Sequence, residues 1–270
     1  MMNDSQVIQW YPGHMAQAMR MIEERLKLVD VVIEVVDARL PLISSNPMLE
    51  EIIGKRARIT VLGREDLAEP AETVKWMTYF NGLGRRAVAV NAKDQNSVGK
   101  VNFPLTQVTL TKKSSRAIVI GTPNTGKSSI INGILRRTAA KAEDRAGVTR
   151  SLQWFRVQAN LELMDSPGIL VPKIKTSQAQ WMLALTGALP RERYDPEVVV
   201  GNFSAWLATQ PAKHGLSRIP DLENYAKARG FLRKGSDLDL HNAAGSFIAD
   251  FNAAKFGRIT FEEPPGESAP

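Results

Sequence analysis

The chain has 270 residues, of which 43% are hydrophobic and 23% are charged, so it is expected to be a compact protein with one large and one smaller domain and not a disordered chain. It contains no cysteine, which excludes disulfides, thiolate metal sites and cysteine nucleophiles and favours a reducing compartment. The net charge of +7 is compatible with a polyanionic partner such as RNA. No signal peptide, transit peptide or apolar run of about 18 residues is recognised, which predicts a cytoplasmic protein with no membrane partner.

Helical and strand patterns alternate through the first two thirds of the chain. Helical spacing of apolar residues at 16–28 leads into a β-branched run at 30–36. Further strand-like runs and helical stretches follow in alternation: strands at 58–62, 86–90 and 117–120, and helices at 71–80 and 127–135. This alternation predicts an α/β domain with a mostly parallel sheet and helices on both faces.

The pattern changes beyond about residue 187. Prolines punctuate segments that look helical, and no series of strands is recognised there. A last helix at 242–255 carries an apolar stripe. We therefore expect a first domain at 1–186, a small all-helical domain at 187–262 and a disordered tail at 263–270.

A phosphate-binding motif follows the strand expected at 117–120. Residues 121–128 read GTPNTGKS and run into a helical stretch, which is the GxxxxGK[ST] pattern in its strand-loop-helix setting. Gly121 and Gly126 permit a close approach of the backbone, so that N–H groups can surround phosphates. Lys127 can reach the β- and γ-phosphates, and Ser128 can ligate Mg²⁺. The alternative interpretation of residues 121–128 is a glycine-rich turn with only a structural role. The nucleotide contacts predicted in this loop are Asn124, Thr125, Gly126, Lys127, Ser128 and Ser129.

A second motif lies downstream of the first. LELMDSPG at 161–168 predicts a strand that ends in DxxG, in which Asp165 would hold the magnesium shell and Gly168 would sense the γ-phosphate. Such a motif is weak evidence alone, because Asp and Gly are common in turns, but its position after the phosphate loop strengthens it. Between the two motifs, Thr149 offers a switch hydroxyl for Mg²⁺, with an ordinary loop threonine as the alternative.

The guanine-reading motif of GTPases, NKxD, has no counterpart after Gly168 but has one upstream. The strand-like run at 59–62 leads into GRED, and the run at 87–90 leads into NAK. These resemble NKxD and SAK in a circularly permuted order, and all the loops would still meet at the carboxyl edge of one sheet. The guanine contacts predicted here are Gly63, Arg64, Asp66, Asn91, Ala92 and Lys93.

Several segments together resemble the YlqF/RbgA family of ribosome-assembly GTPases. They are WYPGHM at 10–15, DARLPLISSNPML at 37–49, GTPNTGKSSIIN at 121–132, MDSPGIL at 164–170, and FIADFNAAKFGRITFE at 247–262, which is similar to the family's closing helix and RNA-facing domain. The resemblance implies a circularly permuted P-loop GTPase domain followed by a helical domain. It also implies binding of GTP and GDP, GTP hydrolysis with Mg²⁺, a monovalent-cation requirement and contact with large-subunit rRNA.

The chain departs from the family at GRED. Gly63 stands where the family has Asn, so the amide that would bind guanine and tie the loop together is missing. Arg64 can replace Lys as a stacking surface, and Asp66 can still accept hydrogen bonds that guanine donates and adenine does not. We expect a guanine preference with weakened affinity, and we expect the substitution Gly63→Asn to tighten binding. The alternative is that GRED is only a charged turn.

Hydrolysis needs a residue that orients the attacking water, and Ile169 stands where many GTPases have a glutamine for this role. His14, within WYPGHM, is the candidate; the alternative is a backbone hydrogen bond in a turn. Asn124 matches the asparagine with which potassium-activated relatives hold K⁺ beside the phosphates, and a plain loop residue is the alternative. The expected catalytic residues are His14, Lys127 and Thr149.

The favoured hypothesis is a GTPase, monomeric away from the ribosome, that docks on the precursor of the large ribosomal subunit, contacts its rRNA, hydrolyses GTP and leaves. The alternative is an RNA-binding scaffold with a degenerate nucleotide site, and an ATPase or kinase is disfavoured by Asp66 and NAK. A basic cluster at 136–150 and another in the C-terminal domain could bind RNA phosphates or could be solvated faces. The candidates in the C-terminal domain are Lys227, Arg229, Arg233 and Lys234.

Overall fold

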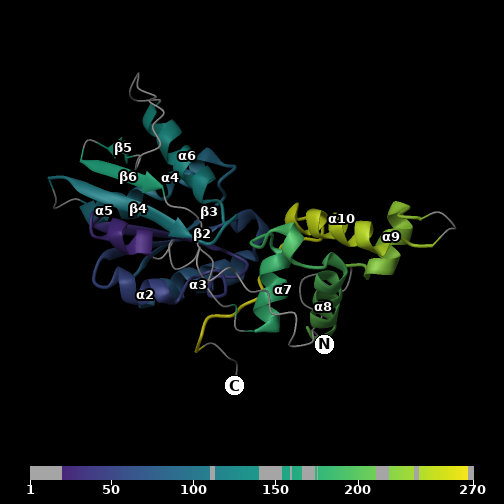
Figure 1. Cartoon of the computed structure of the whole chain (residues 1–270). Helices are drawn as coiled ribbons and strands as arrows, with labels where there is room; N and C mark the ends of the chain where they lie inside the picture. The colour runs from purple at the N-terminus through teal and green to yellow at the C-terminus, as the bar shows by residue number, and fades with distance from the viewer. Residues whose placement is uncertain are drawn as a thin grey trace. The chain divides into compact units, whose positions relative to one another are not determined.

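The computed structural model describes residues 20–109, 113–139, 154–158, 160–165, 174, 176–210, 219–233 and 237–266, with the backbone alone at 136–139, 158 and 165. The chain divides into two compact units, one built on a sheet and one built from helices (Figure 1). No helix in the described ranges is long and apolar enough to cross a membrane.

A six-stranded sheet forms the first unit, with the strand order β3-β2-β1-β4-β6-β5. The strands are β1 (Val31–Asp37), β2 (Ala57–Gly63), β3 (Arg86–Val90), β4 (Ser115–Gly121), β5 (Trp154–Gln158) and β6 (Leu161–Asp165). All neighbours pair in parallel except β5, which pairs antiparallel with β6 at the edge. The sequence predicts the five parallel strands but not β5. The central strand β1 is buried along its whole length, as a parallel strand covered on both faces must be.

Helices cover both faces of this sheet (Figure 1). Along β1, Ile33 and Val35 face one apolar cluster, while Val32 and Val36 face the opposite side. The helices α4 (Gln95–Gly99), α5 (Asn102–Thr109) and α6 (Lys127–Ala139) pack on the first face, and a helical segment at 20–26, α2 (Met48–Ile53) and α3 (Pro70–Gly82) pack on the second. The alternation of side chains in β1 therefore explains the two layers. The expected α/β fold class is confirmed.

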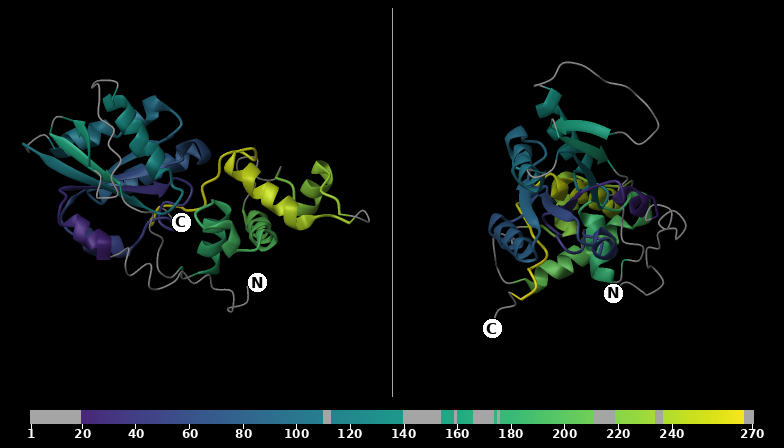
Figure 2. Two further views of the ribbon diagram at one scale, coloured as in Figure 1. Left: turned by 45° about the horizontal axis from the view of Figure 1, so that its top comes forward. Right: turned by 90° about the vertical axis from the view of Figure 1, so that its left-hand side faces the viewer.

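The helical unit contains α7 (Ser177–Leu185), η3 (Arg191–Arg193), α8 (Pro196–Thr209), α9 (Leu222–Arg229) and α10 (Leu240–Asn252) (Figure 2). A side-chain oxygen caps the start of each α-helix by accepting a backbone N–H. The capping residues are Thr176, Asp195, Asp221 and Asp239. The ring of Phe203 on α8 lies 6.1 Å from that of Phe247 and 5.4 Å from that of Phe251, so the apolar stripe of α10 forms the core of this unit.

Both expected boundaries of the helical domain differ in the structure. The helix α7 precedes residue 187 but belongs to the helical unit, because it packs on α8, with the Trp181 and Phe203 rings 6.4 Å apart. At the other end the helical unit stops at Ile259, and Thr260 onward belongs to the sheet unit. The boundary expected at about residue 187 therefore lies inside the helical unit.

Candidate nucleotide-binding site

The phosphate loop at 121–128 connects β4 to α6 through residues with positive φ: 149° at Gly121, 60° at Asn124 and 94° at Gly126. A Cβ on Gly121 would lie 2.1 Å from the carbonyl oxygen of Val35, so only glycine lets the end of β4 lie this close to β1. Because α6 begins at Lys127, N–H groups that have no acceptor inside the helix border the loop.

Lys127 is 7% exposed, and its ammonium lies inside the loop. Its Nζ donates to the Thr122 carbonyl at 2.8 Å, and the Thr125 hydroxyl donates to the same oxygen at 2.9 Å. Ser128 lies next to Lys127 and is exposed. A buried ammonium beside a turn of backbone N–H groups favours an anion, and phosphate is the anion that such loops bind.

The GRED and NAK loops both lie against the phosphate loop. A Cβ on Gly63, at the end of β2, would lie 2.4 Å from the Thr125 carbonyl oxygen. A Cβ on Gly126 would lie 4.0 Å from the Cβ of Ala92. Segments that are about 60 and about 35 residues apart in sequence therefore meet at the carboxyl edge of the parallel strands, where ligands of open α/β sheets bind.

Within these loops, Asp66 pairs with Lys93: the Nζ and Oδ2 atoms are 3.2 Å apart. The backbone N–H of Lys93 donates to Asn91 Oδ1 at 2.9 Å, and the N–H of Asn91 donates to Ser97 Oγ at 2.9 Å, which orders the turn after β3. Lys93 is 77% exposed, so its ion pair is worth little. Asp66 can therefore exchange Lys93 for donors on a base at small cost.

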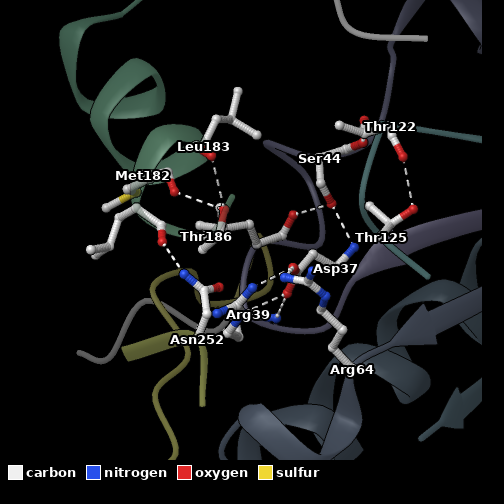
Figure 3. A network of polar contacts seen from close by, with 12 residues as sticks. Asp37, Arg39, Ser44, Arg64, Thr122, Thr125, Met182, Leu183, Thr186 and Asn252 are labelled. Atoms are coloured by element: carbon white, nitrogen blue, oxygen red, sulfur yellow. Dashed lines mark hydrogen bonds and ion pairs between the residues drawn. The ribbon is translucent and has the colours of Figure 1, made fainter. Parts of the chain in front are cut away.

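A buried ion pair at the end of β1 was not assigned a role in the sequence analysis. Arg39 donates from Nε to Asp37 Oδ1 at 2.9 Å and from Nη2 to Oδ2 at 2.8 Å (Figure 3). Arg64 adds a contact of 3.7 Å to the same carboxylate. Burial acts to raise the pKa of Asp37, but Arg39 and Arg64 outweigh it and hold that pKa below its usual value. The sequence signal that could have identified this ion pair is Asp-x-Arg at 37–39, directly after the strand-like run at 30–36.

The segment that begins at this ion pair, which we name the DAR loop (residues 37–47), is closed by Ser44 and bonded to the phosphate loop. The Asp37 N–H donates to Ser44 Oγ at 2.8 Å, and Ser44 Oγ donates to the Leu40 carbonyl at 2.6 Å. The Thr122 hydroxyl donates to the Ser44 carbonyl (Figure 3). The DAR loop is thus a third support of the phosphate loop, beside GRED and NAK.

Several predicted site residues lie outside the described residues, namely His14, Thr149, Gly168 and Lys234. The backbone of Asp165 pairs with Val119, so the DxxG strand ends beside the phosphate-loop strand, but its side chain is not described. The roles of these residues stay predictions.

The described RNA candidates of the helical unit each have an acidic neighbour. Lys227 Nζ lies 3.7 Å from Glu223 Oε2, and Arg233 Nη2 lies 3.3 Å from Asp239 Oδ1. Arg229 forms an ion pair with Asp250. These partners do not exclude phosphate contacts, because the three basic side chains remain 61%, 59% and 47% exposed. Their proposed contact with RNA stays a prediction.

Comparison with known proteins decides the family. The ribosome biogenesis GTPase A of Bacillus cereus is 35% identical to this chain over 96% of the chain and 94% of the relative. That of Thermotoga maritima is 31% identical over 94% of each. The chain belongs to the ribosome biogenesis GTPase A family. The domain family described as 50S ribosome-binding GTPase also matches residues 116–196.

Solved structures agree with this membership of the ribosome biogenesis GTPase A family. GNP-bound YlqF from T. maritima superposes with a TM-score of 0.72 and 29% identity, over 92% of this chain and 99% of that chain. The GDP-bound form of the T. maritima protein superposes with a TM-score of 0.70 and 30% identity, over 91% of this chain and 99% of that chain. The resemblance to YlqF/RbgA and the expected fold are both confirmed.

The packing around Gly63 argues against the expectation that Gly63→Asn tightens nucleotide binding. Any Cβ at this position meets the Thr125 carbonyl at 2.4 Å and Val35 Cγ1 at 3.3 Å, and the carbonyl is backbone of the phosphate loop. Asparagine would therefore displace the loop before its amide could reach a base. At the position of the missing amide, β2 lies directly against the phosphate loop.

We predict that Gly63→Ala lowers GDP affinity about tenfold, equivalent to about 1.4 kcal/mol and within the usual cost of overpacking. Titration with a fluorescent GDP measures this. Gly82→Ala on α3 is the matched control, because a Cβ there has no atom within 4 Å. Unchanged or tighter binding by Gly63→Ala would show that β2 does not support the phosphate loop.

Proposed function

We propose that this protein binds and hydrolyses GTP in the cytoplasm during assembly of the large ribosomal subunit, and that it acts as a monomer away from the ribosome. The observation that carries the proposal is the convergence of the phosphate loop, GRED and NAK on one edge of the sheet, with the ammonium of Lys127 inside the loop. The names of the relatives, ribosome biogenesis GTPase A, and of the matching domain family, 50S ribosome-binding GTPase, support the ribosomal role.

In this proposal each loop contacts a different part of the nucleotide. Lys127 and the first N–H groups of α6 bind the phosphates. Asp66 accepts hydrogen bonds from guanine, beside the ordered turn of Asn91, Ala92 and Lys93. Arg64, whose guanidinium is held near Asp37, precedes Asp66 by two residues in the same loop and supports the base.

We assign Mg²⁺ to Ser128, with Thr149 and Asp165 as further oxygen donors. Ser128 fits this role because it is exposed at the first turn of α6, next to Lys127. Asn124, exposed and with a positive φ in the loop, is the residue that we assign to K⁺. Bound cations supply positive charge where the phosphoryl transition state accumulates negative charge.

Lys127→Ala should abolish detectable GTP binding or lower turnover at least about a hundredfold, because the phosphate charge is then uncompensated in a largely buried loop. Lys75→Ala is the control, since Lys75 is an exposed lysine on α3 paired with Glu72 at 3.2 Å. Turnover and affinity are measured on both variants, with circular dichroism to confirm folding. Wild-type values for a folded Lys127→Ala protein would exclude the P-loop assignment.

The proposed function also requires nucleotide and ribosome to bind cooperatively. The segment after Asp165 leads in sequence from the DxxG strand to α7, so a γ-phosphate contact there could bias the helical unit. We expect large-subunit precursors to bind the complex with a non-hydrolysable GTP analogue about 5- to 150-fold more tightly than the GDP complex. Sedimentation binding at fixed salt measures this ratio, and fixed salt is needed because phosphate contacts are salt-dependent. Equal affinities would favour the scaffold with a degenerate nucleotide site.

A further inference from the structure

Three residues that follow the helical unit lie on the sheet unit, and we name them the strap (residues 260–262). Three hydrogen bonds of 3.0 Å hold the strap in place. Phe261 N donates to the Arg39 carbonyl, and Glu69 N donates to Thr260 Oγ1. Trp76 Nε1 donates to the Glu262 backbone carbonyl. Trp76 is fully buried on α3. These bonds fix the strap against α3 and the DAR loop.

The Glu262 carboxylate contacts two backbone N–H groups of the DAR loop. Its Oε2 accepts the Leu42 N–H at 2.9 Å, and its Oε1 accepts the Ile43 N–H at 3.1 Å. Hydrogen bonds from N–H groups to a charged acceptor are about twice as strong as bonds between neutral groups. A single side chain from the end of the chain therefore holds two consecutive amides of the DAR loop.

These two amides directly precede the residue that contacts the phosphate loop. Ile43 is followed by Ser44, whose carbonyl accepts the Thr122 hydroxyl. The Thr122 carbonyl in turn accepts a hydrogen bond from the Nζ of Lys127. A short series of hydrogen bonds and peptide bonds therefore joins Glu262 to the phosphate-binding lysine.

We propose that Glu262 is a positioning residue for nucleotide binding: it holds the DAR loop so that Ser44 keeps Thr122, and with it the phosphate loop, in the form that receives phosphates. This inference rests on the proposed GTP-binding function. The strap continues directly from Ile259 of the helical unit, so the helical unit is joined in sequence to the support of the phosphate loop as well as to the DxxG segment.

The charge state of Glu262 sets the conditions of a test. Burial raises its pKa to about 7, and Asp37 acts in the same direction, while the N–H groups of Ile43 and Leu42 act against them. Near neutral pH the carboxyl is thus partly protonated, and a protonated carboxyl has lost part of its capacity to accept hydrogen bonds. Binding is best compared at about pH 8, where the carboxylate is ionised.

The test measures fluorescent-GDP affinity of the full chain and of Glu262→Ala, Glu262→Gln and Glu263→Ala. We expect about a tenfold loss for Glu262→Ala, a smaller loss for Glu262→Gln, which keeps one acceptor oxygen, and no change for the exposed neighbour Glu263. Combining Glu262→Ala with Ser44→Ala should cost less than the sum of the two single losses, because both act through one loop. Full additivity, or wild-type affinity of Glu262→Ala, would overturn the proposal.

A measurement on the wild-type protein covers the case in which Glu262→Ala does not fold. By linkage, GDP should slow hydrogen exchange at the amides of Leu42 and Ile43 by at least about fivefold. GDP-independent exchange at both amides would overturn the role of Glu262 and leave the proposed function intact. Failure of the wild-type protein to bind GDP or GTP would refute the proposed function itself.

Discussion

The close approach of the phosphate loop to the ends of β1 and β2 is the constraint on which the site depends. At Gly121 and at Gly63 a single added carbon would collide with backbone carbonyl oxygens, at 2.1 Å and 2.4 Å. Both positions lie at the carboxyl edge of the sheet, where β1 lies between β2, which carries the GRED loop, and β4, which carries the phosphate loop. Glycine is therefore a packing requirement at both positions, and at Gly121 the φ of 149° adds a backbone requirement.

The permuted order of motifs changes which segments flank this site. With β1 and its DAR loop before the base-reading strands, an ion pair of Asp37 and Arg39 is buried beside the phosphate loop. A buried, doubly hydrogen-bonded pair of this kind gives a defined loop geometry. The helical unit, inserted between β6 and the strap, is continuous in sequence with both the DxxG strand and the support of the DAR loop.

Much of this arrangement was predictable from local patterns. The buried strands and the GTPNTGKS loop could be recognised because apolar runs and glycine spacing are short-range features, and the upstream GRED and NAK loops indicated the permutation. The packing of Gly63 on Thr125 could not be predicted, because it depends on two strands that are distant in sequence. For the same reason the resemblance to NKxD predicts tighter binding for Gly63→Asn, whereas the packing of Gly63 predicts weaker binding. The strap was missed because ITFE at 259–262 directly follows a helical stretch and has no pattern that assigns it to the sheet unit instead of the helical domain.

The account's central claim is that a base loop without the asparagine of NKxD still selects guanine, through Asp66 and the turn at 91–93. The most direct test is the affinity of the full chain for GDP and for ADP, with magnesium, by competitive titration. A site that hydrogen-bonds guanine leaves Asp66 unsatisfied with adenine, so we predict that GDP binds at least about a hundredfold more tightly. Equal affinities for the two nucleotides would contradict the claim.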